Sequence, residues 1–322
     1  MPEQTSNRAR FLLDPWSSDF SASVQADADP ETTAAAEIDP TIETTIWDAL
    51  PPGTPPASAW FVDGVRRLDA RLVGWRDGDI VHGLFASFAV GAVAISDGRA
   101  SFAHCIAERR LILTSAGTHS ELLRIGKAEL LFQNLPHLGA NPADLVLALQ
   151  TAMRNAEAKL AEACGSEVAF LDGPLAYVTE PRGPIVGVIK TIHRLYLNSY
   201  YMALVFRLGK GHRTPIFSIR EGAKNRYSWY LRIGEGRSIH HGLSGIVRLE
   251  ARAAAGLDNA VTLANMSAAY LPRFASTPAR DPRAPQNLTP VGALEEHLRN
   301  QMGDATLIQR AIERRISEGL FL

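Results

Sequence analysis

The sequence has 322 residues, of which 46% are hydrophobic and 21% are charged, enough to bury the core of one large domain or two small ones. It contains no apolar run close to the roughly 20 residues of a membrane-spanning helix. Residues 1–16 do not combine a basic segment, an apolar stretch and a small-residue cleavage site, so no secretory signal is apparent. We therefore expect a cytoplasmic protein without membrane association.

The net charge of -1 conceals two segments of opposite sign. Residues 1–50 hold ten acidic residues and two arginines, whereas residues 182–252 hold thirteen Lys or Arg and three glutamates. The acidic segment ends at the Pro-rich stretch 51–56, so residues 1–56 are predicted to form a disordered arm and linker before one folded domain over 57–322. The basic segment favours a polyanionic partner, although a solvated face of ordinary strands would carry the same charge.

The first elements after the linker are predicted strands. A short apolar strand covers residues 60–62. Three longer segments alternate as antiparallel strands do: 69–76, 82–95 and 100–114. Asp-Gly pairs at 77–78 and 97–98 connect them and suit tight hairpin turns, because both positions tolerate positive φ.

Helices are predicted on both sides of a second apolar strand. We expect one helix over about 118–135 and another over 142–164, where Asn141 is the N-cap and Pro142 lies in the first turn. The further elements are a strand over 168–171, several strands over 185–250, and helices from near Pro290 and Ala305. This order predicts an α/β fold with an RNase H-like mixed sheet flanked by helices and additional β insertions.

Three carboxylates stand at positions that could carry chemistry. Asp63 and Asp172 follow short, fully apolar strands, and such positions face the crevice at the carboxyl end of a strand in an α/β sheet. Glu157 lies about 90° from the centre of the apolar stripe of its helix, at the edge of the buried face. Each also has a plain structural explanation, as a turn residue or as a surface carboxylate.

Converging carboxylates raise one another's pKa by like-charge repulsion, and a hard divalent ion relieves that repulsion with oxygen ligands. Two such ions can activate a water and stabilise the leaving oxygen of a phosphodiester. An oxygen-rich site suits manganese or magnesium, whereas zinc favours more His or Cys ligands. The predicted reaction is hydrolysis of a nucleic-acid backbone.

Several segments, taken in order, resemble the NurA family of nucleases over roughly residues 60–304. The segment 61–64 is similar to the first aspartate motif of that family, and 154–160 to its glutamate helix. The remaining similar segments are 169–190 (the second aspartate motif with a following lysine), 228–233 with 245–252 (a strand pair), and 287–304 (the closing segment).

The resemblance implies a homodimeric deoxyribonuclease that uses manganese or magnesium and digests single- and double-stranded DNA from 5′ to 3′, with single-strand endonuclease activity in addition. It implies two ions held by Asp63, Glu157, Asp172 and His297, with Lys190 against the scissile phosphate. It also implies a HerA-type hexameric ATPase as partner, in DNA end processing or in defence.

The sequence departs from the family pattern at three positions. Val65 and Pro174 follow the two Asp-Gly pairs where the family has serine, and Thr289 stands eight residues before His297 where the family has tyrosine. Because Glu295 lies nearer the apolar face of that helix, it is the substitute candidate for His297.

Seven basic residues are expected to contact the DNA backbone: Lys190, Arg207, Lys210, Arg213, Arg220, Lys224 and Arg226. The alternative function is a DNA clamp or adaptor subunit of the ATPase complex that cuts little. Retention of all three carboxylates favours the enzyme, because a clamp does not need them.

Overall fold

The computed structural model describes residues 10–13, 36–76, 78–114, 119–165, 167–222, 224–236 and 239–320. The strands are β1 (Arg10–Leu13), β2 (Glu37–Asp39), β3 (Ser58–Arg76), β4 (Asp79–Ser96), β5 (Arg99–Leu113), β6 (Glu121–Ile125), β7 (Ala128–Leu135), β8 (Val168–Asp172), β9 (Ile185–Ile189), β10 (Phe217–Glu221), β11 (Lys224–Arg232) and β12 (Ile246–Arg252). The helices are α1 (Pro142–Glu162), α2 (Ser199–Arg207), α3 (Leu257–Tyr270), α4 (Thr289–Gln301) and α5 (Ala305–Ser317).

Twelve strands of the described residues form one mixed sheet, in the order β2-β10-β11-β12-β9-β8-β3-β4-β5-β7-β6, with β1 paired to β3. Its centre has the connectivity of an RNase H core. β3, β4 and β5 are consecutive antiparallel strands, and β8 and β9, which follow α1, run parallel to β3. The order β5-β4-β3-β8-β9, in which only β4 is antiparallel, confirms the predicted fold class. The additional β structure consists of β1, β2, β6, β7, β10, β11 and β12.

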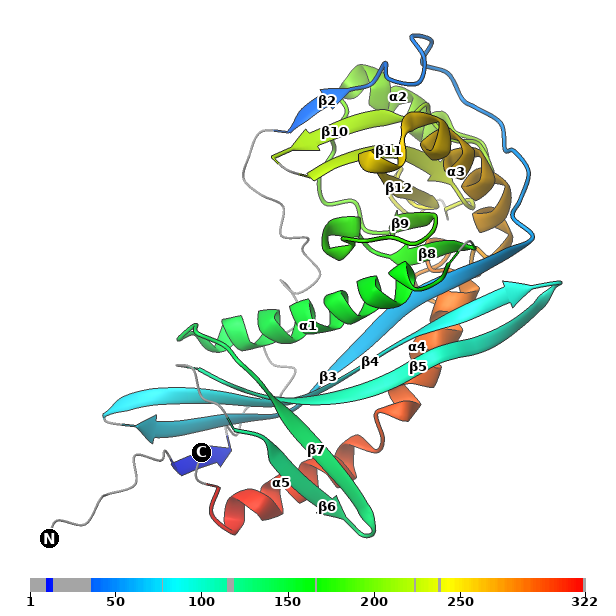
Figure 1. Cartoon of the computed structure of the whole chain (residues 1–322). Coiled ribbons are helices and arrows are strands. Elements are labelled where there is room, and N and C mark those ends of the chain that lie inside the picture. The colour runs from blue at the N-terminus through cyan, green and yellow to red at the C-terminus, as the bar shows by residue number, and fades with distance from the viewer. Residues whose placement is uncertain are drawn as a thin grey trace, which may run out of the picture.

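Helices cover both faces of the central strands, with α1 on one face and α4 on the other (Figure 1). Side chains that alternate along β4 divide between the two layers. Phe88 and Val90 pack with Leu149 of α1, while Ala89 and Val93 belong to the cluster that contains the apolar side chains of α4. Because successive side chains of a strand point to opposite faces, one apolar strand supplies both cores.

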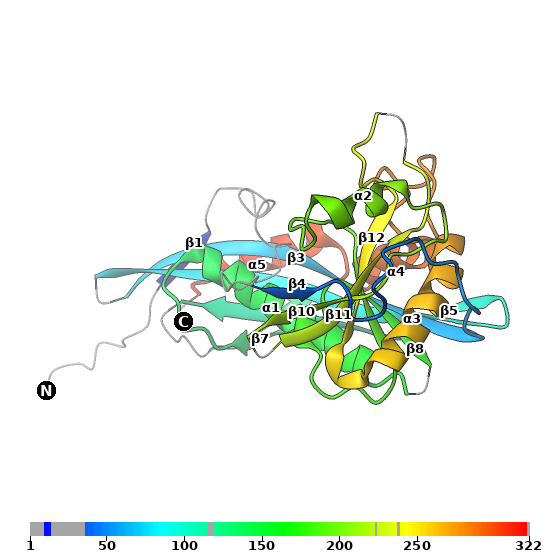
Figure 2. The same ribbon diagram turned by 90° about the horizontal axis from the view of Figure 1, so that it is seen from above.

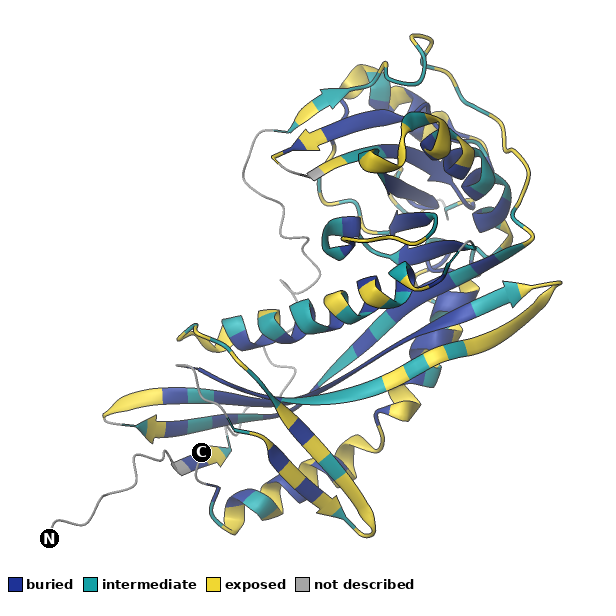
Figure 3. Ribbon diagram, in the orientation of Figure 1, coloured by how far each residue is buried: buried dark blue, intermediate teal, exposed yellow. Residues whose placement is uncertain are grey.

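The long strands β3, β4 and β5 extend over most of the length of the molecule (Figure 2). The middle of the sheet is buried, whereas the outer part of β5 and much of the β6–β7 hairpin are exposed (Figure 3). None of the described helices is long and apolar enough to cross a membrane.

The predicted helix over 118–135 is wrong, because its described residues contain the hairpin β6–β7. Gly126 makes the turn at a φ of 59°. Leu123 and Phe132 point from the hairpin into a core that includes Phe85 and the apolar side chains of α5. Packing against α5 therefore selects the strand conformation in a segment whose short apolar runs are compatible with either structure.

The Asp-Gly turn between β4 and β5 is confirmed, since Asp97 and Gly98 have φ values of 51° and 71°. Between β3 and β4, Gly78 has a φ of 89°, and Asp77 lies outside the described residues.

The predicted N-terminal arm lies largely outside the described residues, which omit 1–9 and 14–35. Two described parts of it belong to the sheet, since β1 pairs with β3 and β2 pairs with β10. Leu50 also exchanges backbone hydrogen bonds with Arg213. The boundary at residue 56 stays a prediction.

Candidate active site

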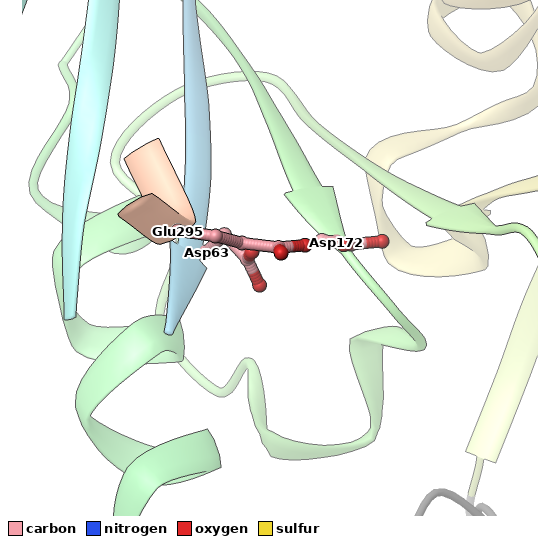
Figure 4. A group of neighbouring side chains, drawn as sticks. All are labelled: Asp63, Asp172 and Glu295. Carbon is pink, nitrogen blue, oxygen red and sulfur yellow. The ribbon is translucent and has the colours of Figure 1, made fainter. Parts of the chain in front are cut away.

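The pairing of β3 with β8 brings two aspartates together. The parallel ladder ends at the pair Val62 and Leu171, and Asp63 and Asp172 are the next residues on the two strands, so their side chains leave the sheet on the same face. One oxygen of each lies with one of Glu295 in a group whose atoms are all within 4.8 Å of one another. The three side chains point toward one another (Figure 4).

The structure places the two aspartates differently along their strands. Asp172 ends β8, as expected, whereas Asp63 lies inside β3, which continues to Arg76. Asp63 is only 5% exposed, so the cluster lies below the outer surface of the molecule.

Glu295 reaches the cluster from α4. Val291, Leu294 and Leu298 are buried against the sheet, and this packing fixes the rotation of the helix and the direction of Glu295. Arg283 donates to both carboxylate oxygens of Glu295 at 3.0 Å, and Arg299 donates to one of them at 3.0 Å. Burial raises the pKa of Glu295, but these hydrogen bonds and charges outweigh it and lower the pKa, so the side chain is an ionised acceptor.

The opposite holds for Asp63, whose pKa is raised well above its ordinary value. Burial is the largest cause, and the negative charges of Asp172 and Glu157 add to it, while the charge of Lys190 opposes it. Like-charge repulsion is thus one of the two causes that disfavour the ionised form of Asp63. A divalent cation with oxygen ligands would remove this repulsion.

Glu157 lies behind the cluster on α1, with 1% of its surface exposed. Its Oε2 accepts a hydrogen bond from Arg154 at 2.9 Å, whereas Oε1 is buried without a hydrogen bond of ordinary geometry. Burial and the charge of Asp172 raise the pKa of Glu157 to about 7 despite Arg154, and the nearby N–H of Gly64 opposes the rise only weakly. A Cβ atom at Gly64 would come within 2.6 Å of Oε1, so a larger residue there would displace the carboxylate of Glu157.

Two cations contact Asp172 from different sides. The Nζ atom of Lys190, which follows β9, lies 2.6 Å from Oδ2 of Asp172 and 2.8 Å from Oδ1 of Asn287. Arg154 donates to the backbone carbonyl of Asp172 at 2.7 Å and to Glu157, so it ties α1 to the end of β8. Both cations offset part of the carboxylate charge.

The carboxylates open into a cleft of about 610 Å³. Asp63, Asp172 and Glu295 are the acidic residues of its lining. Seven basic side chains surround them: Arg66, Arg154, Lys190, Arg194, Arg248, Arg283 and Arg299. An acidic centre in a basic wall fits a ligand that carries negative charge along its length and reacts at one point.

The model of the NurA domain matches residues 82–291, well over half of the chain. The chain belongs to the NurA family. The solved structure of the NurA nuclease from Sulfolobus solfataricus matches with a TM-score of 0.41 and 9% identity, over 80% of this chain and 86% of that one. Curated proteins show no match to the chain.

NurA is a family of nucleases, and the matched region contains Glu157 and Asp172. Asp63 and Glu295 lie outside that region, one on each side of it, yet the fold brings both to Asp172.

His297, expected as a NurA-type ligand, lies away from the cluster. Its ring stacks on Phe102 of β5 with centroids 4.0 Å apart, and its Nε2 is 3.0 Å from the side-chain nitrogen of Gln301. It does not line the cleft. Glu295, one helical half-turn earlier, lies next to the aspartates. Thr289, which stands where the family has tyrosine, donates its hydroxyl to the carbonyl of Phe274.

Of the residues expected to contact DNA, Lys190 lines the cleft. Arg213 is only 1% exposed and pairs with Glu43 at 2.7 Å, and Arg226 is held between Glu221 and Glu250. These ion pairs correct the expectation for both arginines, because their donors are already bound inside the protein.

The other expected contacts lie outside the lining of the cleft. Arg207 donates to a carbonyl of its own helix, Arg220 pairs with Glu37, and Lys210 is exposed in the following loop. The side chain of Lys224 is not among those the structure describes. Four arginines that were not among the expected contacts line the cleft: Arg194 and Arg248 from the basic segment 182–252, and Arg283 and Arg299 from the segment after it.

Proposed function

We propose that the protein is a metal-dependent deoxyribonuclease whose site is built by Asp63, Asp172 and Glu295, with Glu157 behind them. The observation that carries this proposal is the convergence of three carboxylates from β3, β8 and α4 in a basic cleft. Their oxygen atoms suit Mn²⁺ or Mg²⁺, and a bound cation would offset the burial and the like-charge repulsion that raise the pKa of Asp63. Two ions are expected, as in the carboxylate sites that hydrolyse phosphodiesters.

When bound, such ions activate a water for attack on the phosphodiester and stabilise the leaving oxygen. The protein's own residues position the substrate and the ligands. Lys190, as a compact point charge at the edge of the cluster, is placed to bind the phosphate next to the scissile bond. Arg154 holds Glu157 and the end of β8 in register.

The substrate proposed for the cleft is DNA, held through its backbone. Arg194 and Arg248 both lie against the ring of Tyr196, with guanidinium carbons 4.9 Å and 5.1 Å from its centroid. Stacking and ion pairs hold these side chains in place, so DNA binding costs them less conformational entropy. Contacts of this kind make binding fall steeply with salt.

Membership of the NurA family supports the finer parts of the proposal. We propose 5′–3′ exonuclease activity on single- and double-stranded DNA with single-strand endonuclease activity in addition, a homodimer, and a HerA-type hexameric ATPase that delivers DNA to the cleft. DNA as substrate also favours a cytoplasmic protein that acts in DNA end processing or in defence.

The test is cleavage of 5′-labelled single-stranded DNA with manganese, magnesium or a chelator. Asp63→Asn and Asp172→Asn should abolish cleavage and leave DNA binding largely intact. Asp97→Asn, in an exposed hairpin turn whose positive φ Asn also tolerates, is the matched control and should cut normally. Binding without cleavage under every metal condition, also with an ATPase partner, would support the DNA clamp or adaptor instead.

A further inference from the structure

A chain of hydrogen bonds outside the cluster joins two of its carboxylates. It runs from Asp172 of β8 to Glu295 of α4 through the segment that precedes α4, in the order Asp172, Lys190, Asn287, Asp281, Arg283, Glu295. Both ends of this chain are members of the carboxylate group, and its middle is not.

Asn287 is the buried centre of this chain, with 2% of its surface exposed. Its Oδ1 accepts from Nζ of Lys190 at 2.8 Å, and its Nδ2 donates to Oδ2 of Asp281 at 2.5 Å. An ammonium group can only donate and an ionised carboxylate can only accept, so the two neighbours allow one orientation of the amide. Burial opposes ionisation of Asp281, but hydrogen bonds from Arg283 and Asn287 lower its pKa to about 2, so it is an acceptor.

The second half of the chain fixes an exposed arginine. The side chain of Arg283 is 55% exposed, and long exposed side chains lose rotamer entropy when they are held in one geometry. Its guanidinium donates to Asp281 at 3.1 Å and to both oxygens of Glu295 at 3.0 Å. Asp281 therefore orients the group that in turn orients Glu295.

We propose that Asn287 is a positioning residue of the carboxylate site: its carbonyl oxygen holds Lys190 beside Asp172, and its amide nitrogen holds the Asp281–Arg283 pair that aims Glu295 into the cleft. The inference rests on the proposed function of that site. Its physical basis is that Asn287 and Asp172 compete for the hydrogen bonds of Lys190. Without Asn287, Lys190 has Asp172 as its remaining hydrogen-bond partner among the contacts described above, and a tighter pair excludes a metal ion from that carboxylate.

The test is Asn287→Leu, which keeps the size of the side chain and removes both hydrogen bonds. Binding of Mn²⁺ alone to the full chain, measured by calorimetry without DNA, should weaken by about 10- to 100-fold, the usual cost of losing a partner of a metal ligand. Asn259→Leu is the matched control, because Asn259 lies on the exposed side of α3 and only donates to a carbonyl of its own segment. Its Mn²⁺ affinity should equal that of the wild type.

A second pair of variants separates positioning from a merely structural role. If Asn287 acts through Lys190, then Asn287→Leu should weaken Mn²⁺ binding less in a Lys190→Met background than in the wild type. Fully additive effects of the two substitutions would overturn the proposal. Asp281→Asn, which leaves Asn287 and Lys190 in place, keeps the proposal testable if Asn287→Leu does not fold, and it should also weaken Mn²⁺ binding by about tenfold.

The outcomes distinguish this proposal from the proposed function. If the wild type binds Mn²⁺ and cuts DNA while the folded Asn287→Leu variant binds Mn²⁺ equally well, the positioning role is refuted and the nuclease stands. If the wild type neither binds Mn²⁺ nor cuts DNA, the proposed function itself is refuted.

Discussion

Replacing Glu157 with Gln should stabilise the metal-free protein at alkaline pH. The pKa of Glu157 is raised from its ordinary 4.5 to about 7, mainly by burial. Between these values the folded protein binds a proton that the unfolded chain has lost, so the free energy of unfolding falls as pH rises through this interval and stays lower above it. Gln has the shape of the protonated acid and can still accept from Arg154, so the variant avoids this loss.

The size of the effect follows from the difference of about 2.5 pKa units. At about 1.36 kcal/mol for each unit, Glu157→Gln should raise the free energy of unfolding by about 3 kcal/mol at pH 8. With 1% of Glu157 exposed, solvent screening does not reduce this figure much. Below pH 4.5 both proteins carry a neutral group at this position, and their stabilities should be equal.

The assay is urea denaturation in the presence of a chelator at pH 4 and pH 8. Glu296→Gln, which removes an exposed carboxylate of α4, is the control and should change stability little at either pH. The reasoning is refuted if Glu157→Gln is no more stable than the wild type at pH 8. It is also refuted if the gain is the same at both pH values, because burial of a charge then does not explain it.

Three further predictions concern other groups. Arg213→Met should lower the free energy of unfolding by about 3 kcal/mol, because Glu43 loses its bidentate partner while it stays largely buried. A variant whose free energy of unfolding in urea equals that of the wild type would contradict this. His297→Ala should leave Mn²⁺ affinity and cleavage at wild-type levels, since its ring packs on Phe102; a large loss of either would restore His297 as a metal ligand. Mn²⁺ should raise the melting temperature more at pH 8 than at pH 5, because protons already neutralise Asp63 at low pH, and equal shifts at the two pH values would speak against a carboxylate site.

Part of the site could be predicted because its residues are marked by their neighbours in the chain. Asp63 and Asp172 each follow a short run of apolar residues that favours a buried strand, and two parallel strands place such residues side by side. Glu157 stands on the edge of a helical stripe, and the structure buries it behind the aspartates. In each case the signal is local periodicity, which the sequence carries directly.

Glu295 and the basic wall of the cleft are less visible in the sequence. Glu295 is one of two adjacent glutamates on α4, and only the packing of Leu294 and Leu298 decides that it, and not Glu296, faces the aspartates. In the sequence, Glu295 was marked only by its position near the apolar face of the helix. Arg213 shows the converse, since a basic residue in a basic segment proved to be buried against Glu43.

The sequence by itself predicted the element order of an RNase H-like core, apart from the helix over 118–135, and the two aspartates that follow apolar strands, because the periodicity of buried residues is a property of the chain. Only the tertiary structure decided that 121–135 is a hairpin, that Glu295 completes the carboxylate group, and that Asn287 lies between Lys190 and Asp281. These features depend on contacts between segments far apart in the chain, whose free energy comes from packing and ion pairing across the fold and leaves no periodic trace in either segment.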